Sequence, residues 1–357
     1  MSRIVVAFSR EEPYIREFLA LPGRLYSRQD SVQQPEEERQ LLTGTHILSP
    51  SFTFIPLLVL GEQGTAISRA ALTIYPKDPD ACLGFFESED DEEAVRLLLE
   101  KAEQLAGDFH CSRILGPIDA SFWIRYRFKI NHFDCSYTGE PYNKEYYPRL
   151  WMSAGYEVLE RYSSNHYTPV PCSHENTHFS ERLAQKRAEG YVIKSPSRAD
   201  FTRTLHEVYG LLIELYKEFP AYRPITKEEF TSLYGYLKWL VHYPMIKMAY
   251  YQEQPVGFFI SIPDYGHQVY GNLTIRDYLK ILLTRIRPRS YVMLYMGVNP
   301  VHRGLGKALA EAIKEELKKT GSPSVGALIR QGNINKDYFR ELVDYEFAYV
   351  LLGKTLS

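Results

Sequence analysis

A chain of 357 residues predicts two domains, because globular domains run to about 100 to 200 residues each. Hydrophobic residues make up 45% and charged residues 24%, which excludes disordered, collagenous and fibrous classes. The 42 Lys and Arg nearly balance the 44 Asp and Glu, and the net charge of -2 argues against nucleic acid or an anionic membrane as a partner.

The cysteines and the apolar stretches bear on location. The four cysteines, Cys82, Cys111, Cys135 and Cys172, lie far apart, which favours reduced thiols over a disulfide framework. The longest apolar stretch, residues 54–60, is far shorter than the roughly 20 residues that span a bilayer. Charged residues also follow the short apolar N-terminus at once. We therefore expect a cytoplasmic protein.

The first half alternates strand and helix patterns. A Gly61-Glu-Gln-Gly64 turn separates two apolar runs rich in β-branched residues, which predicts a hairpin. Further on, apolar residues recur at helical spacing, with Asp90 or Asp91 as N-cap and Gly107 as stop. The expected elements are strands over 52–60, 65–75, 81–86 and 113–118 and a helix over 92–106.

A change of composition indicates the domain boundary. Residues 122–128 are aromatic-rich and irregular, so they either line a pocket or pack in a core. Residues 163–178 are polar and contain two prolines and three histidines, which is typical of a connection between domains. We place the boundary near residue 170, between domains 1–170 and 171–357.

The three histidines of this connection, His166, His174 and His178, invite a metal interpretation. They lack acidic or cysteine companions at ligand spacing, so no metal site is expected.

The second half repeats the order of the first. The expected elements are helices over 201–219 and 227–241, a hairpin over 245–262, strands over 291–298 and 324–330, a helix over 308–319 and a closing helix. Asn143 to Leu150 also matches Asn335 to Leu342, and Val158-Leu159 matches Val350-Leu351 at the same offset. The chain is interpreted as a divergent duplication.

The most informative stretch is 291–310, an apolar strand that continues through a small-residue loop into a helix. A helix start offers unpaired N–H groups and partial positive charge, and Gly304 and Gly306 let a phosphate approach the main chain. Arg303 adds a charge. The P-loop is excluded because Ala308 follows Lys307, and the dinucleotide loop lacks its third glycine.

The Arg303-Gly-Leu-Gly306-Lys-Ala308 signature, preceded by Val298-Asn-Pro300, resembles the coenzyme A pyrophosphate loop of the GNAT superfamily of acyl-CoA N-acyltransferases. The resemblance covers about residues 190–357 and implies an α/β fold with a mixed sheet. It also implies acetyl-CoA, or another acyl-CoA, as co-substrate. The residues it assigns to coenzyme A are Met296, Val298, Arg303, Gly304, Leu305, Gly306, Lys307, Ala308 and Asn335.

The first half looks like a second, degenerate GNAT domain. At its corresponding turn it carries the acidic run Glu87 to Glu93, which would repel a pyrophosphate. Segments Gly116 to Trp123 and Pro141 to Pro148 are similar to a group of bacterial tandem-GNAT proteins.

The resemblance also implies a mechanism. Backbone N–H groups around Met296 and Val298 would hold the pantetheine arm and polarise the thioester carbonyl, and an amine would attack without an acyl-enzyme. The family's usual tyrosine acid, on the last helix, is replaced here by Leu342. Tyr338 and Tyr345 lie one helical turn to either side, and we prefer Tyr338.

The general base is left open among Tyr295, His302, Asp264 and a bound water. We expect a cytoplasmic tandem-GNAT enzyme that transfers an acyl group, by preference acetyl, to the primary amine of a small molecule or peptide. Two alternatives stay open: a non-catalytic acyl-CoA sensor, and a peptidoglycan-type aminoacyl transferase, against which the intact loop and near-neutral charge argue.

Overall fold

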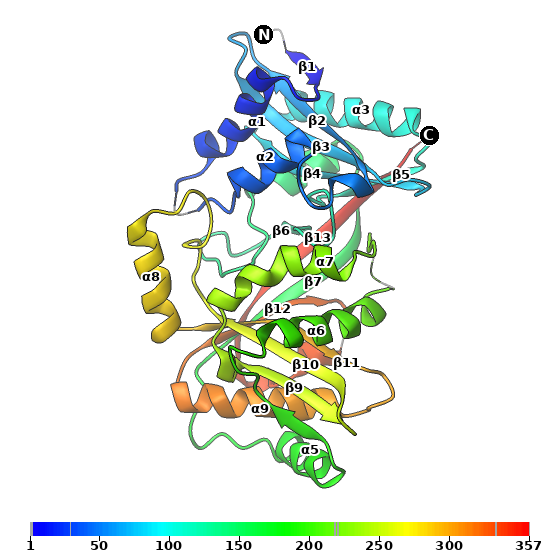
Figure 1. The fold of residues 1–357 in the computed structure, drawn as a ribbon. Coiled ribbons are helices and arrows are strands. Elements are labelled where there is room, and N and C mark those ends of the chain that lie inside the picture. Colours follow the sequence, from blue (N-terminus) through cyan, green and yellow to red (C-terminus); the bar gives the residue numbers. More distant parts are fainter. Residues whose placement is uncertain (1–2, 29, 218, 220, 333, 357) are drawn as a thin grey trace.

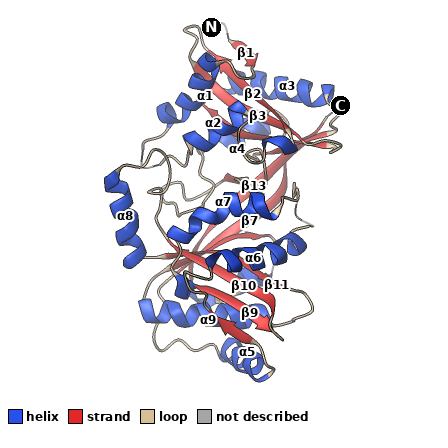
Figure 2. Cartoon of the chain, viewed as in Figure 1, coloured by secondary structure: helices blue, strands red, loops and turns tan. Residues whose placement is uncertain are grey.

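A computed structural model describes residues 3–28, 30–217, 219, 221–332 and 334–356, without the side chains of residues 334 and 335. The described chain forms two lobes at the two ends of one twisted mixed sheet (Figure 1). Helices cover the sheet on both sides (Figure 2), as expected for layers that must bury their apolar faces. No helix among these residues is long and apolar enough to cross a membrane.

The first half of the chain contains β1 (Ile4–Ala7), α1 (Glu12–Leu25), α2 (Pro35–Thr43), β2 (Thr53–Leu60), β3 (Ala66–Ile74), β4 (Asp80–Ser88), α3 (Glu92–Asp108), β5 (Arg113–Gly116), β6 (Phe128–Lys129), α4 (Tyr147–Ser153) and β7 (Glu157–Tyr167). The second half contains α5 (Thr177–Ala188), β8 (Val192–Lys194), α6 (Phe201–Leu215), α7 (Lys227–Tyr234), β9 (Ile246–Tyr251), β10 (Gln254–Pro263), α8 (Ile275–Ile286), β11 (Tyr291–Val298), α9 (Leu305–Thr320), β12 (Ser324–Arg330) and β13 (Val343–Thr355).

The last strand of each half lies in the sheet of the other half. The strand order is β1-β2-β3-β4-β5-β13-β7-β12-β11-β10-β9-β8, so β13 pairs with β5 while β7 pairs with β12. The two exchanged strands run antiparallel to each other over most of their length. Each half therefore completes its sheet only with backbone from the other half.

Most of the expected elements are confirmed. The β2–β3 hairpin, α3, β11 and β12 lie where the patterns predict them, and α9 begins three residues earlier than expected. The predicted helices over 201–219 and 227–241 are shorter, because α6 ends at Leu215 and 3-10 turns follow α7.

Two predictions are wrong. Residues 163–167 are not part of a loose connection but the end of β7, because they pair with both β12 and β13. The closing helix is also absent from the described chain. Short 3-10 turns at 334–337 and 340–342 lead directly into β13. The backbone of β13 forms a strand because it pairs with β5 on one side and β7 on the other.

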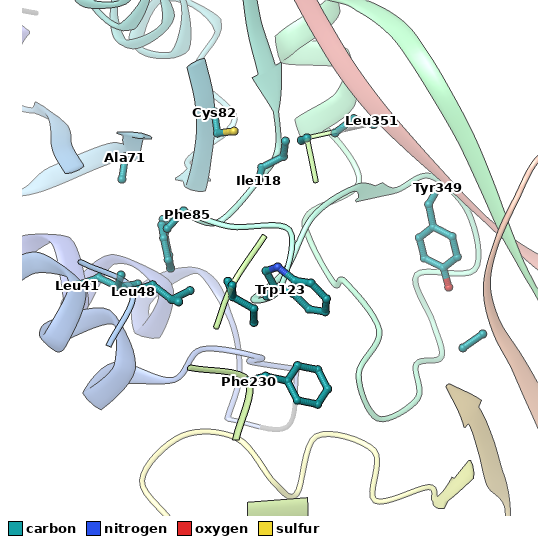
Figure 3. Packing of buried hydrophobic residues seen from close by; sticks show 14 of the residues in the cluster. Leu41, Leu48, Ala71, Cys82, Phe85, Ile118, Trp123, Phe230, Tyr349 and Leu351 are labelled. Carbon is teal, nitrogen blue, oxygen red and sulfur yellow. The ribbon is translucent and has the colours of Figure 1, made fainter. Parts of the chain in front are cut away.

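The aromatic-rich insert packs in the core rather than lining the main cleft. Trp123 lies beside Phe230 (Figure 3). It also packs against Tyr222 and Tyr234, and its indole donates to the Arg223 carbonyl at 2.8 Å. This cluster joins side chains of both lobes into one core. The insert therefore fixes how the lobes meet.

Candidate functional site

The two central strands of the second lobe separate where the predicted motif begins. β11 and β12 pair in parallel only at Tyr291, Val292 and Met293, opposite Ser324 to Gly326. On the other side, β11 stays paired with β10, but Leu294 is an extra residue in that ladder and forms a bulge. Beyond Met293 the β12-facing edge of β11 therefore has backbone groups without a strand partner.

The helix start beyond this opening has the geometry of an anion site. Gly304 precedes α9 at φ 79°, a conformation that favours glycine, and no side chain caps the helix. The first N–H groups of a helix lack intrahelical acceptors. A Cβ built on Gly306 would lie only 3.3 Å from the Tyr338 hydroxyl. A larger side chain at position 306 would therefore fill the space between the helix start and Tyr338.

A cleft of about 650 Å³ runs from this helix start along the separated strands. Five of the predicted coenzyme A residues line it: Met296, Val298, Arg303, Gly304 and Gly306. Leu305 and Ala308 are instead buried in the core beneath the helix. The Lys307 ammonium lies 2.5 Å from His178 Nε2, and the side chain of Asn335 falls outside the described residues.

Tyr338 lines the cleft at its helix-start end. Its hydroxyl faces Gly306, its carbonyl accepts a hydrogen bond from the Tyr167 hydroxyl at 3.1 Å, and its ring packs edge-on against Phe179. Burial raises the pKa of its phenol. The bulge at Leu294 lies four residues before Val298, roughly 13 Å along the strand. Tyr338 is thus placed nearer the phosphate end than the opening between the strands.

The other tyrosine candidates face elsewhere. Without a closing helix, Tyr345 is not one helical turn from Leu342; it lies on β13, where its ring stacks on His166 with centroids 4.5 Å apart. Tyr345 is not among the residues that line the cleft. Neither is Tyr295, which is 36% exposed and lies close to Arg127.

The remaining base candidates are engaged in hydrogen bonds. Asp264 accepts from the Thr138 amide and hydroxyl, the Gly266 amide and the Ser290 hydroxyl, so it holds a turn between the lobes. His302 lines the cleft, and its Nδ1 lies 2.8 Å from the Tyr191 hydroxyl.

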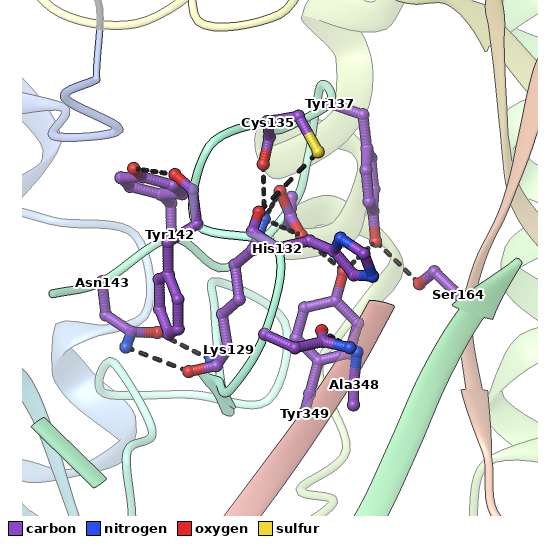
Figure 4. Close-up of polar contacts among 12 residues, drawn as sticks. Lys129, His132, Cys135, Tyr137, Tyr142, Asn143, Ser164, Ala348 and Tyr349 are labelled. Carbon is purple, nitrogen blue, oxygen red and sulfur yellow. Dashed lines mark hydrogen bonds and ion pairs between the residues drawn. The ribbon is translucent and has the colours of Figure 1, made fainter. Parts of the chain in front are cut away.

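The opposite wall of the opening is held by a buried hydrogen-bonded chain. Leu328 of β12 has φ 57°, an uncommon value for a residue with a side chain. Its N–H donates to Ser164 Oγ at 2.8 Å. The Tyr137 hydroxyl lies 2.8 Å from that oxygen (Figure 4). Tyr137 lies in turn 2.9 Å from the Tyr349 hydroxyl, which donates to Glu140.

Each hydroxyl in this hydrogen-bonded series can donate to only one neighbour. Tyr349 uses its proton on Glu140, so Tyr137 donates to Tyr349 and Ser164 donates to Tyr137. Glu140 also forms a fully buried ion pair with Lys129 at 2.8 Å. Burial raises the pKa of Glu140 to about 7 even though the Lys129 ammonium opposes the shift. The chain anchors the unusual backbone of Leu328, which lines the cleft.

Some contributors were missed by the sequence analysis. Arg182 of α5 reaches the loop, because its Cδ lies 3.0 Å from a Cβ built on Gly304. In the sequence, Arg182 is recognisable only as a basic residue of a helix in the second half, which does not indicate that it reaches the loop. Tyr137, Ser164 and Tyr349 carry no local signal, since they meet only through the exchanged strands.

The linker histidines do not gather. His166 stacks on Tyr345, while His174 lies 3.0 Å from Glu341 and His178 contacts Lys307. Within the described residues, a group that could hold a cation is instead His132, Asp134 and Cys135, whose ligand atoms all lie within 4.8 Å of one another.

Comparison with known proteins shows the fold. No family model matches the chain, and no curated protein matches it. A tandem GNAT protein from the clavulanic acid biosynthesis pathway superposes over 100% of this chain and 99% of its own, with TM-score 0.54 and 12% identity.

Two further solved structures are similar over nearly the whole chain. A GCN5-related N-acetyltransferase from Sphaerobacter thermophilus matches over 99% of this chain and 96% of its own, with TM-score 0.51 and 14% identity. A probable N-acyltransferase from Enterococcus faecalis V583 matches over 100% and 73%, with TM-score 0.52 and 11% identity. At such identities the likeness concerns architecture.

Proposed function

We propose that this chain, which has the tandem GNAT fold, is an acyl-CoA-dependent N-acyltransferase whose second lobe binds the acyl-CoA, by preference acetyl-CoA. The observation that carries the proposal is the cleft between β11 and β12, which ends on the uncapped start of α9. The fold neighbours named as N-acetyltransferases support the reaction class.

The residues present suit coenzyme A. The free N–H groups at the start of α9 would hold the pyrophosphate, with positive charge from Arg303 and Arg182 beside them. The unpaired edge of β11 around Met296 and Val298 would take the pantetheine arm. Tyr338, beside Gly306, would contact the phosphate end.

Acyl-CoA supplies the acyl group as a thioester. The amine nitrogen forms a bond to the carbonyl carbon and loses a proton, the carbon–sulfur bond breaks, and the leaving thiolate takes up a proton. Backbone N–H groups of the splayed β11 would stabilise the carbonyl oxygen, an effect worth about 3 to 4 kcal/mol per donor in other enzymes. His302 is a candidate for moving a proton, because it lines the cleft.

Calorimetric titration with acetyl-CoA tests the proposal. The wild type should bind with micromolar affinity, and Gly306→Glu should weaken binding at least about 100-fold by placing a carboxylate at the phosphate site. Gly304 is less suitable for substitution, since its φ of 79° would strain any side chain.

Gly107→Glu is a matched control. Gly107 lies on α3 of the other lobe, and a Cβ there meets nothing within 4 Å. Equal affinity in wild type and Gly306→Glu, or an equal loss in Gly107→Glu, would overturn the assignment.

One observation favours a second candidate, a non-catalytic acyl-CoA-binding protein. The closing helix of the family is replaced by 3-10 turns, and Leu342 stands at the usual tyrosine position. Release of free thiol from acetyl-CoA, followed over a panel of amines, distinguishes the two. Binding without amine-dependent thiol release for any amine would favour the sensor.

A further inference from the structure

Helix α8 presents an apolar face to solvent. It is inserted between β10 and β11 and lies at the side of the molecule, away from the sheet layers (Figure 1). Only Ile281 of this helix is buried. Six large apolar side chains lie 48 to 81% exposed: Ile275, Tyr278, Leu279, Leu282, Leu283 and Ile286.

These six side chains form one continuous stripe. At 3.6 residues per turn their positions fall within an arc of roughly 140° on the helix. Single exposed apolar residues are ordinary on protein surfaces, but a contiguous group of this size is typical of an interaction site. The stripe therefore requires something to cover it.

Contacts at the start of the helix hold it in this position. Thr274 and Asp277 form a capping box at its start, and Asp277 also pairs with Arg28 of the first lobe at 2.6 Å. Just before the helix, the Gly271 amide donates to the Gln33 carbonyl at 3.0 Å. These contacts tie the polar side of α8 to the molecule and leave the apolar stripe outward.

Basic residues border the stripe on both sides. Arg276 lies two turns from Leu283, and Arg285 lies two turns from Tyr278, so each edge of the apolar arc carries a guanidinium. Lys280, Arg287 and Arg289 add positive charge nearby. Asp277 is the one acid between residues 275 and 289, and Arg28 neutralises it. The net charge of -2 for the whole chain conceals this basic segment.

We propose that α8 docks on an anionic lipid surface, with its apolar stripe in the headgroup and acyl boundary and its basic borders on the lipid phosphates. An apolar stripe flanked by Lys and Arg is the arrangement that lies in the membrane interface. A second copy of the chain is disfavoured as occupant, because two α8 helices side by side would bring their basic residues together. This binding surface is separate from the acyl-CoA cleft.

Vesicle co-sedimentation tests the inference. The full chain should bind phosphatidylcholine vesicles that contain phosphatidylglycerol about tenfold better than phosphatidylcholine alone, and added salt should weaken that binding. The double variant L279E/L283E should lose it, since both side chains are exposed and their replacement leaves the core intact. R276Q/R285Q should lose most of the preference for anionic lipid.

The control variant is I47E/M152E, which places the same two charges on exposed apolar residues of the first half and should bind like wild type. Thermal unfolding of all variants verifies their folding. Absence of a preference for anionic vesicles, or binding that L279E/L283E leaves unchanged, would overturn the inference. So would a dimer in sedimentation velocity that L279E/L283E converts to monomer, because the stripe would then be covered by a second copy.

Discussion

The two lobes build the same opening and use it differently. In the first lobe β4 and β5 pair in parallel over three residues and then part, as β11 and β12 do in the second. There the chain itself fills the gap: the Ile118 amide donates to the Leu83 carbonyl, and the Phe85 amide donates to Asp119. In the second lobe the gap is a cleft of about 650 Å³.

The N-termini of α3 and α9 show the same difference between the two lobes. Asp91 caps α3 by accepting from the Ala94 amide at 3.0 Å, and it pairs with Arg3. At the start of α9, Gly304 has no side chain to occupy the donors. One lobe thus satisfies its own helix start and its own strand edge, while the other leaves both available to a ligand. The same strand arrangement thus encloses packed chain in the first half and an open cleft in the second.

Disrupting the segment that fills the gap between β4 and β5 should have the largest effect on stability. Asp119 is buried and holds both the Phe85 amide and the Arg125 side chain, so Asp119→Ala should cost roughly 3 kcal/mol of unfolding free energy in urea. Exposed Asp134→Ala is the control and should cost little. Wild-type stability in Asp119→Ala would show that this carboxylate does not hold the segment between β4 and β5 in place.

The hydrogen-bonded series that supports Leu328 should have the next largest effect on stability. Tyr137→Phe removes the hydroxyl that links Ser164 to Tyr349, which should lower the unfolding free energy by about 1.5 kcal/mol and reduce kcat/KM because Leu328 lines the cleft. In Tyr222→Phe the lost hydroxyl is buried without a hydrogen-bond partner in the described chain, so both quantities should stay near wild type. Equal effects in the two variants would contradict an anchoring role.

Tyr338→Phe sharpens the assignment of the cleft's two ends. Because its hydroxyl faces Gly306, we expect acetyl-CoA affinity to fall about fivefold, roughly 1 kcal/mol, with little change in kcat at saturation. Tyr345→Phe, which lies off the cleft, should alter neither. A fall in kcat with unchanged affinity would instead make Tyr338 the proton donor to the thiolate.

The smallest effect concerns pH. Burial opposes ionisation of Asp91, but hydrogen bonds from the Ala94 amide and Arg3 outweigh it and hold its pKa below that of a free aspartate. A lowered folded pKa contributes stability above the unfolded pKa, and that contribution, about 0.5 to 1 kcal/mol, is lost as pH falls through the folded value. Asp91→Asn should flatten the pH dependence of unfolding below pH 4. An unchanged slope would show that the cap does not titrate there.

Local sequence patterns predicted the helix and strands around the cleft better than they predicted the two exchanged strands. Local patterns suffice for β11, the glycine loop and α9, because strand alternation, missing Cβ atoms and helix spacing are properties of neighbouring residues. The same reasoning placed the closing segment in a helix and residues 163–167 in a linker. Both are strands, since their partners lie more than 150 residues away in the chain.

What the sequence by itself determined is the uncapped glycine start of α9 and the acidic, self-capped start of α3, since both follow from residues next to one another. Only the tertiary structure decided that Tyr338 meets Gly306, that Tyr345 leaves the cleft, and that Ser164 and Tyr137 support Leu328. These contacts follow from the exchange of β7 and β13, in which the burial and pairing of distant strands outweigh local preference.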